Sequence, residues 1–355
     1  MCCAMTPSTA NSVSVGILGG SGYTGAELVR LLAHHPQTEI NLLTADRQAG
    51  KPMADVFPHL SGVDLPALKR IEDADWDGLD VVFCALPHGT TQDVVAGLPD
   101  HLRVIDLSAD FRLRDTDVYA DWYGQPHRAP ALQQQAVYGL TELYRDAIRE
   151  ARLVACPGCY PTTAQLPLVP ALEAGCISPD EIIIDAKSGV TGAGRAPKEA
   201  TLFAEVGEGV HAYGVAGHRH APEIEQGLAA AAGRPVTVNF TPHLMPMNRG
   251  ILATIYVRLA DGAEAGDLRA ALVERYRDEP FVRVVDEGVV PATRHVRGSN
   301  LCLIGVFPDR LPGRAIILSV TDNLVKGASG QAVQNMNVAC GIAETEGLSQ
   351  EPLFP

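Results

Sequence analysis

The 355-residue sequence has no hydrophobic run that approaches the roughly 18 residues needed to suggest a membrane span. Its first 29 residues contain no Lys or Arg, so we expect neither a secretory signal nor an Arg-rich transit peptide. Its eight cysteines are too few for a dense disulfide framework in a chain of this size. We therefore expect a cytoplasmic protein with reduced thiols and no membrane contact.

Positive charge is also scarce. The 28 Lys and Arg residues are outnumbered by 42 Asp and Glu residues, which gives a formal net charge of −14. This balance argues against broad binding to nucleic acid or to acidic membranes. A protein of this kind that handles an anionic small molecule must gather its few arginines locally, so single arginines in glycine-rich segments are of interest.

The length and the order of the predicted elements indicate two domains. Short apolar runs alternate with helical stretches in the first part, which favours a parallel sheet wound with helices. These runs lie at residues 13–18, 40–43, 80–86 and 102–107. After residue 159 strands follow one another with few helices between them, as in a mixed or antiparallel sheet. They are predicted at residues 181–185, 236–240, 250–259, 281–285, 301–306 and 315–321.

We predict an α/β fold with an N-terminal Rossmann-like, doubly wound domain and an α+β domain for catalysis and oligomerisation. The first domain comprises residues 13–158 and 323–355, the second residues 159–322, and residues 1–12 form a loose tail. A weakly amphipathic helix at 327–342 is expected to return to the first domain.

A dinucleotide-binding fingerprint lies at the start of the first domain. The sequence GSGYTG (residues 20–25) matches G-x-G-x-x-G, with a predicted strand before it and a helix after it. Its glycines allow backbone N–H groups to approach a pyrophosphate at the helix N-terminus. After the second strand, Thr44 and Arg47 favour the 2′-phosphate of NADP, whereas Asp46 leaves NAD open.

Cys159 is the candidate nucleophile. Pro161 suits the first turn of a helix, which places Cys159 at a helix N-terminus, where the dipole and free N–H groups favour a thiolate. A thiolate beside a nicotinamide points to oxidation or reduction at the aldehyde level through a thioester. Cys156 and Cys159 also form a C-x-x-C pair, so a redox pair, a structural zinc site or an inert cysteine are alternatives. No second Cys/His pair at ligand spacing is evident, and we predict no metal.

A base for this thiol is sought in HRHAPE (residues 218–223). Pro222 predicts a helix that begins next to His220, and the helix dipole keeps that ring neutral, as a base should be. His218 is the alternative base, and Glu223 could orient a ring by accepting its other N–H. For an anionic substrate, the candidate arginines are Arg112, Arg195 and Arg249. Arg195 closes a predicted loop, SGVTGAGR (residues 188–195), whose backbone could hold a phosphate.

Together these residues resemble the N-acetyl-gamma-glutamyl-phosphate reductase family, within the aspartate-semialdehyde dehydrogenase superfamily. The motifs that carry the resemblance run from the first strand to near the C-terminus. They are GGSGYTGAEL (19–28), ALPHG (85–89), IDLSADFR (105–112), PGCYPT (157–162), HRHAPE (218–223) and DNLVKG (322–327).

The resemblance implies an enzyme of arginine biosynthesis that uses NADPH to convert N-acetyl-glutamyl 5-phosphate to N-acetyl-glutamate 5-semialdehyde and phosphate. It also implies a homo-oligomer, a tetramer or a dimer. The implied cofactor contacts, besides Thr44 and Arg47, are Gly19, Gly20, Ser21, Gly22, Tyr23, Thr24, Gly25, Leu86, Pro87, Ser188, Gly189 and Asn323. The implied substrate contacts are Ser108, Arg112, Tyr138, Gly192, Arg195 and Arg249.

Two other functions stay open at this point. A related acyl-phosphate reductase, acting on aspartyl phosphate or on a carrier-linked amino acid, would share every chemical step. A non-catalytic NADP sensor would share the fold but would need no activated thiol.

Overall fold

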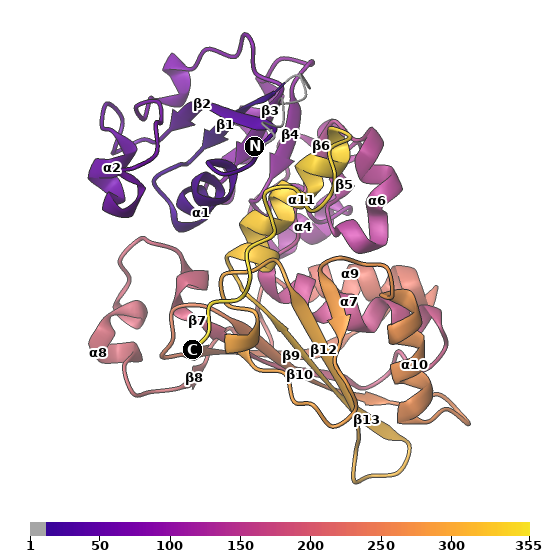
Figure 1. The fold of residues 1–355 in the computed structure, drawn as a ribbon. Coiled ribbons are helices and arrows are strands. Elements are labelled where there is room, and N and C mark those ends of the chain that lie inside the picture. The colour runs from indigo at the N-terminus through magenta and orange to yellow at the C-terminus, as the bar shows by residue number, and fades with distance from the viewer. Residues whose placement is uncertain (1–11) are drawn as a thin grey trace, which may run out of the picture.

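The computed structural model describes residues 12–355, so most of the predicted tail lies outside the described residues. Two sheets organise the molecule, one in each half of the chain, and the last helix lies between them (Figure 1). This confirms the predicted α/β class.

The first sheet has six strands in the order β2-β1-β3-β4-β6-β5, and every neighbouring pair is parallel. Parallel pairing requires crossovers, which the helices between the strands supply. The strands are β1 (Val13–Leu18), β2 (Thr38–Thr44), β3 (Val81–Cys84), β4 (Arg103–Asp106), β5 (Val137–Tyr138) and β6 (Leu153–Ala155). The helices are α1 (Tyr23–Leu32), α2 (Met53–Val56), α3 (Thr91–Ala96), α4 (Thr116–Tyr123), α5 (Pro130–Gln133) and α6 (Thr141–Glu150).

The second sheet has seven strands in the order β11-β12-β13-β10-β7-β9-β8, and it is mixed, as predicted. Its long strands alternate buried and more exposed residues, because one face packs on helices α7, α9 and α10. The strands are β7 (Ile182–Gly189), β8 (His211–Ala212), β9 (Val238–Met245), β10 (Ile251–Arg258), β11 (Val282–Val284), β12 (Cys302–Pro308) and β13 (Arg314–Thr321). The helices are α7 (Cys159–Glu173), α8 (Phe203–Val206), α9 (Ala221–Ala232) and α10 (Ala265–Arg275).

The end of the chain returns to the first domain. A one-turn π-helix, η6 (Val325–Ser329), leads into α11 (Gly330–Ala339), which packs against α6 and α1 (Figure 1). Gly327 in this turn lies so close to α7 that a Cβ atom there would be 2.8 Å from Cβ of Cys159. The π-turn therefore forms the wall behind the candidate nucleophile.

Two expectations about these elements were wrong. The helix at the end of the chain is not amphipathic: every residue of α11 is buried, because it lies between other elements rather than on the surface. The predicted glycine-rich loop also begins later than expected, because Ser188 and Gly189 continue β7 and pair with β10 and β9. None of the helices among residues 12–355 is long and apolar enough to cross a membrane.

Candidate active site

Cys159 is the first residue of α7, and a short connection joins it to strand β6. Gly158 is its N-cap, with the extended conformation that this position requires, and Pro161 stands in the first turn. A Cβ atom on Gly158 would lie 2.5 Å from Nε2 of His220. Only glycine therefore allows the imidazole ring of His220 to lie against the residue before the cysteine.

The structure distinguishes the two candidate histidines. Nδ1 of His218 accepts a hydrogen bond from the backbone N–H of His220 at 3.1 Å, so the neutral ring carries its proton on Nε2 and has no free lone pair. His220 caps α9, and its Nδ1 is buried without a hydrogen-bond partner in the described part of the chain. Burial, with His218, Arg112 and His88 acting in the same sense, holds the pKa of His220 well below 6.5. His220 is therefore a neutral ring with a lone pair to accept a proton.

The ionisation of Cys159 differs from the expectation. Burial raises the pKa of its thiol to about 11, although Arg112 and the backbone N–H groups of Tyr160 and Cys159 act to lower it. Without substrate, burial thus outweighs the helix N-terminus, and the group at neutral pH is a thiol rather than a thiolate. The thiol must give up its proton as it attacks, which makes a neighbouring base necessary.

Glu223 has a different role from the one expected. One carboxylate oxygen accepts hydrogen bonds from the N–H of Gly158 and from the hydroxyl of Tyr138, both at 2.8 Å. The other oxygen lies 3.6 Å from Nη1 of Arg112. Glu223 therefore does not orient a histidine ring; it holds the N-cap before Cys159 in place.

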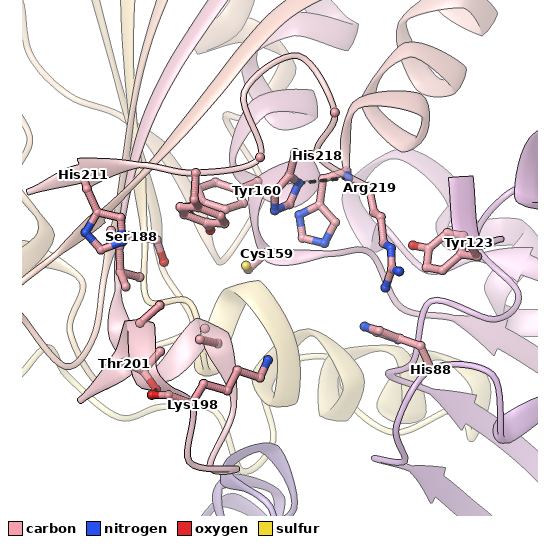
Figure 2. A pocket seen from close by; sticks show the side chains of 18 residues that line it. His88, Tyr123, Cys159, Tyr160, Ser188, Lys198, Thr201, His211, His218 and Arg219 are labelled. Atoms are coloured by element: carbon pink, nitrogen blue, oxygen red, sulfur yellow. Dashed lines mark hydrogen bonds between the residues drawn. The ribbon is translucent and has the colours of Figure 1, made fainter. Parts of the chain in front are cut away.

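Cys159, His218 and His220 border an open pocket of about 430 Å³ between the two domains (Figure 2). No Asp or Glu is among the residues that line it within the described chain, whereas Lys198 and Arg219 bring positive charge. The lining residues that carry polar or aromatic side chains are His88, Tyr123, Cys159, Tyr160, Ser188, Lys198, Thr201, His211, Tyr213, His218, Arg219 and His220. Such a pocket suits an anionic ligand, in contrast to the acidic protein as a whole.

The lining residues that were not predicted as site residues include His88, Tyr123, Lys198 and Arg219. His88 lies in the motif ALPHG and Arg219 in the motif HRHAPE, and these motifs could have marked both residues as parts of the site. Tyr123 had no local signal, because α4 brings it to the pocket from a distant part of the sequence. Gly192 and Ser188, which were predicted, do line the pocket.

The predicted substrate arginines do not line this pocket. The guanidinium of Arg112 is buried and donates to the carbonyls of Cys156 and Leu107, each at 2.8 Å. Arg249 pairs with Glu27 of α1, at 2.7 and 3.0 Å. Both guanidinium groups are therefore committed to holding the fold together.

Arg195 reaches the fingerprint instead. Its guanidinium donates to the carbonyl of Ser21 at 3.0 Å and lies 4.4 Å from the centre of the Phe57 ring. This position is beside the expected cofactor rather than beside the substrate.

Other predicted contacts have structural partners. The Ser108 hydroxyl donates to Asp106, and that of Tyr138 donates to Glu223. A Cβ atom on Gly189 would lie 2.6 Å from the carbonyl oxygen of Asn248, so this glycine permits a close backbone approach. Asn323 is buried and bonds to Gly250 and Thr191.

The fingerprint has the geometry that a dinucleotide requires. Gly19 has φ +85°, and a Cβ on Gly25 would lie 2.5 Å from the carbonyl oxygen of Gly19, so the helix packs tightly on the strand. Gly22 caps α1 without a side-chain cap, which leaves the helix N-terminus available to an anion. Thr44 is fully buried and accepts a hydrogen bond from Gly19, so it is not available to a 2′-phosphate, whereas Arg47 is exposed.

The two cysteines of the C-x-x-C pair are separate free thiols in different surroundings. Cys156 is buried, its thiol accepts a hydrogen bond from Asn335, and burial raises its pKa to about 12. The one cluster of potential metal ligands within residues 12–355 is Glu142, Glu279 and Glu344, and Arg145 pairs with the last two of these. The six cysteines that the structure describes are all free thiols.

Two family models match the chain. Residues 14–151 match the semialdehyde dehydrogenase NAD-binding domain, and residues 159–323 match the semialdehyde dehydrogenase dimerisation domain. Among solved structures, the chain resembles aspartate semialdehyde dehydrogenase II from Vibrio cholerae, complexed with ASA, with a TM-score of 0.70. The identity is 17%, and the match covers 94% of this chain and 99% of that one. An aspartate semialdehyde dehydrogenase with NADP from Candida albicans gives a TM-score of 0.66 at 17% identity, over 92% of this chain and 98% of that one.

Curated proteins are much more similar in sequence. The N-acetyl-gamma-glutamyl-phosphate reductase of Rhodospirillum rubrum is 65% identical over 348 residues, which are 97% of this chain and 99% of that protein. A probable chloroplastic N-acetyl-gamma-glutamyl-phosphate reductase of Arabidopsis thaliana is 61% identical, over 97% of this chain and 86% of its own length.

Proposed function

The chain belongs to the N-acetyl-gamma-glutamyl-phosphate reductase family, and from that premise we propose that Cys159 and His220 carry out the reaction in the pocket between the domains. The reaction reduces N-acetyl-glutamyl 5-phosphate with NADPH to N-acetyl-glutamate 5-semialdehyde and phosphate, a step of arginine biosynthesis. The observation that carries the residue assignment is the position of His220, a neutral ring whose Nε2 lies directly beside Gly158, the N-cap of the cysteine helix.

The protein residues divide the chemistry as follows. Sγ of Cys159 attacks the acyl carbon while His220 takes the thiol proton; the S–C bond forms, the C–O bond to phosphate breaks, and phosphate leaves. After hydride transfer to the thioester carbonyl, His220 returns the proton, the C–S bond breaks, and the aldehyde leaves with the thiol restored. Glu223 holds Gly158, and His218 holds the backbone N–H of His220, so both act as positioning residues.

The residues at the fingerprint fit the cofactor. The open N-terminus of α1, the close approach at Gly19 and Gly25, and Leu86 beside Gly19 form a cradle for a pyrophosphate and its ribose. Arg47 is the proposed partner of the 2′-phosphate. NADPH, when bound, supplies the hydride. The remaining proposed contacts of the cofactor are Gly20, Ser21, Gly22, Tyr23, Thr24, Pro87 and Arg195.

The first test is the reverse reaction, followed as NADPH formation from N-acetyl-glutamate semialdehyde, NADP and phosphate. We expect phosphate-dependent turnover by the wild type and none by Cys159→Ala, while Cys156→Ser keeps most of its activity. Turnover of aspartate semialdehyde, without turnover of N-acetyl-glutamate semialdehyde, would show that the substrate is a different acyl phosphate.

Alkylation of the thiols separates an enzyme from a sensor. Burial raises the pKa of Cys159 to about 11. The fraction of thiolate, and with it the rate of reaction with iodoacetamide, should therefore still rise at pH values above about 8.5, the pKa of a free cysteine. Cys84 is fully buried, its pKa is raised well above 9.0, and it should react more slowly. Cys340 is half-buried like Cys159, and equal labelling of these two thiols at neutral pH would argue for a sensor, in which no base assists Cys159.

The two domains have separate proposed roles. Residues 13–158 and 323–355 form the cofactor domain, and residues 159–322 form the catalytic and oligomerisation domain. The half-exposed face of the second sheet joins copies of the chain into a homo-oligomer, which sedimentation would detect. The protein works in the cytoplasm, where its thiols stay reduced; cell fractionation would test this.

A further inference from the structure

The pocket has two cationic side chains whose charged ends have no hydrogen-bond or ion-pair partner within the described residues, Arg219 and Lys198. They approach the cavity from different sides, and the ring of His88 is turned to the same part of the cavity as Arg219 (Figure 2). We propose that Arg219 and His88, one from each domain, form the site that binds the phosphoryl group of the substrate. This inference rests on the proposed acyl-phosphate chemistry.

His88 is fixed as a hydrogen-bond donor. Its Nδ1 accepts a hydrogen bond from the backbone N–H of Ala109 at 3.0 Å, so a neutral ring must carry its proton on Nε2, which is left for the pocket. Burial lowers the pKa of His88 to about 4, and Arg112, Arg219 and Lys198 act in the same sense. At neutral pH the ring is therefore a neutral donor rather than a cation or a base.

The loop that carries His88 is held by a buried carboxylate. Asp110 accepts hydrogen bonds from the backbone N–H groups of Gly89, at 2.7 Å, and Thr91, at 2.9 Å. Gly89 has φ +83°, a conformation that few other residues adopt. The position of the donor is thus set before any ligand arrives.

Arg219 rests on an aromatic platform tied to the same carboxylate. Its guanidinium carbon lies 5.0 Å from the centre of the Tyr123 ring, and Tyr123 stacks on Tyr119 with 4.7 Å between the ring centres. The hydroxyl of Tyr119 donates to Asp110 at 3.2 Å. A guanidinium that lies over a ring face keeps the N–H groups on its edges free for oxyanions.

The number and geometry of the donors favour the phosphoryl group over the substrate carboxylate. A guanidinium presents a planar fork that binds two oxygens at once, and Nε2–H of His88 adds a donor from another direction. A phosphoryl group offers three terminal oxygens, whereas a carboxylate offers two in one plane. Lys198 approaches from the other side of the cavity, which leaves it to the substrate carboxylate (Figure 2).

The reverse reaction provides the test, because there phosphate and the semialdehyde are separate substrates. Arg219→Ala should raise the KM for inorganic phosphate about tenfold or more, the range expected when hydrogen bonds to a charged group are lost. The KM for the semialdehyde should stay within about twofold. His88→Ala should act in the same direction, and His88→Gln, which keeps an N–H donor, should be milder. Arg149→Ala, at an exposed ion pair with Asp146, is the matched control and should change neither KM.

Binding of inorganic phosphate, followed by the width of its ³¹P NMR signal, provides an independent readout. The wild type should broaden the signal, and Arg219→Ala and His88→Ala should not. A rise in the semialdehyde KM without a rise in the phosphate KM would overturn the inference, as would unchanged values of both. If the wild type gave no turnover, the proposed function would fail, and the phosphate signal alone would still decide whether the site exists.

Discussion

Two groups of cationic side chains lie close together in this molecule but differ in their partners. The first group lies where the two domains meet, which we call the seam, and consists of Arg112, Arg195 and Arg249. Each of these arginines donates to carbonyl or carboxylate oxygens of the protein. Arg219 and Lys198 line the pocket, where their charged ends meet no such oxygen in the described chain. The comparison teaches that the partner decides the role: paired cations hold the fold, and unpaired ones remain available to a ligand.

The largest effect on stability is expected at Arg112. Arg112→Ala would leave Glu223 without its charged partner, and two carbonyls without their donor, in a place where the arginine is 6% exposed and the glutamate 1%. Breaking a buried pair in this way costs about 3–5 kcal/mol. Urea denaturation measures the loss in the free energy of unfolding. A loss below about 1 kcal/mol would mean that Arg112, like Arg219 and Lys198, contributes little to the stability of the fold.

A smaller loss is expected at Arg249. Arg249→Ala should lower the free energy of unfolding by about 1–3 kcal/mol, because Glu27 is buried but keeps Arg30 at 2.7 Å as a second partner. The double variant with Glu27→Gln should lose less than the sum of the two single variants, since the residues interact directly. Strict additivity would show that the pair does not stabilise the seam.

Arg195 should show a mixed effect. Arg195→Ala removes a hydrogen bond to the fingerprint carbonyl and a contact with Phe57, so stability should fall by only about 0.5–1 kcal/mol. The KM for NADP should rise about fivefold, as a loss of about 1 kcal/mol in binding would produce. A rise in the KM for the semialdehyde, with no change in the KM for NADP, would show that Arg195 contacts the substrate.

The smallest effect on stability is expected at Lys198. Lys198→Met should change the free energy of unfolding by less than about 0.5 kcal/mol, because its side chain is exposed and no ion pair is broken. Its KM for the semialdehyde should rise, and its KM for phosphate should not, which is the reverse of the expectation for Arg219→Ala. Thermal unfolding and steady-state kinetics of the same preparations measure both quantities.

The sequence allowed the local features to be predicted. The fingerprint, the helix that begins at Cys159 and the helix after His220 follow from short patterns, because caps, prolines and glycines act within a few residues. The role of an arginine depends instead on residues far away in the chain. Glu27 is 222 positions from Arg249, and no short pattern indicates that the two will meet.

The ionisation of the site could not be predicted for the same reason. The helix N-terminus at Cys159 was visible in the sequence, but the burial that raises the pKa of its thiol depends on the tertiary structure. The tautomer of His88 depends on Ala109, which β4 and its loop bring to the ring. Each of these properties arises from tertiary packing, which local patterns do not contain.

The contact between Gly327 and Cys159 has a consequence for the timing of synthesis. At about 5–20 residues per second, a ribosome completes the cysteine helix roughly 8–30 s before it completes the π-turn behind it. During that interval the cofactor domain also lacks α11, whose every residue is buried in the finished protein. An unfinished chain therefore carries the nucleophile without its back wall, and the active site forms among the last parts of the molecule.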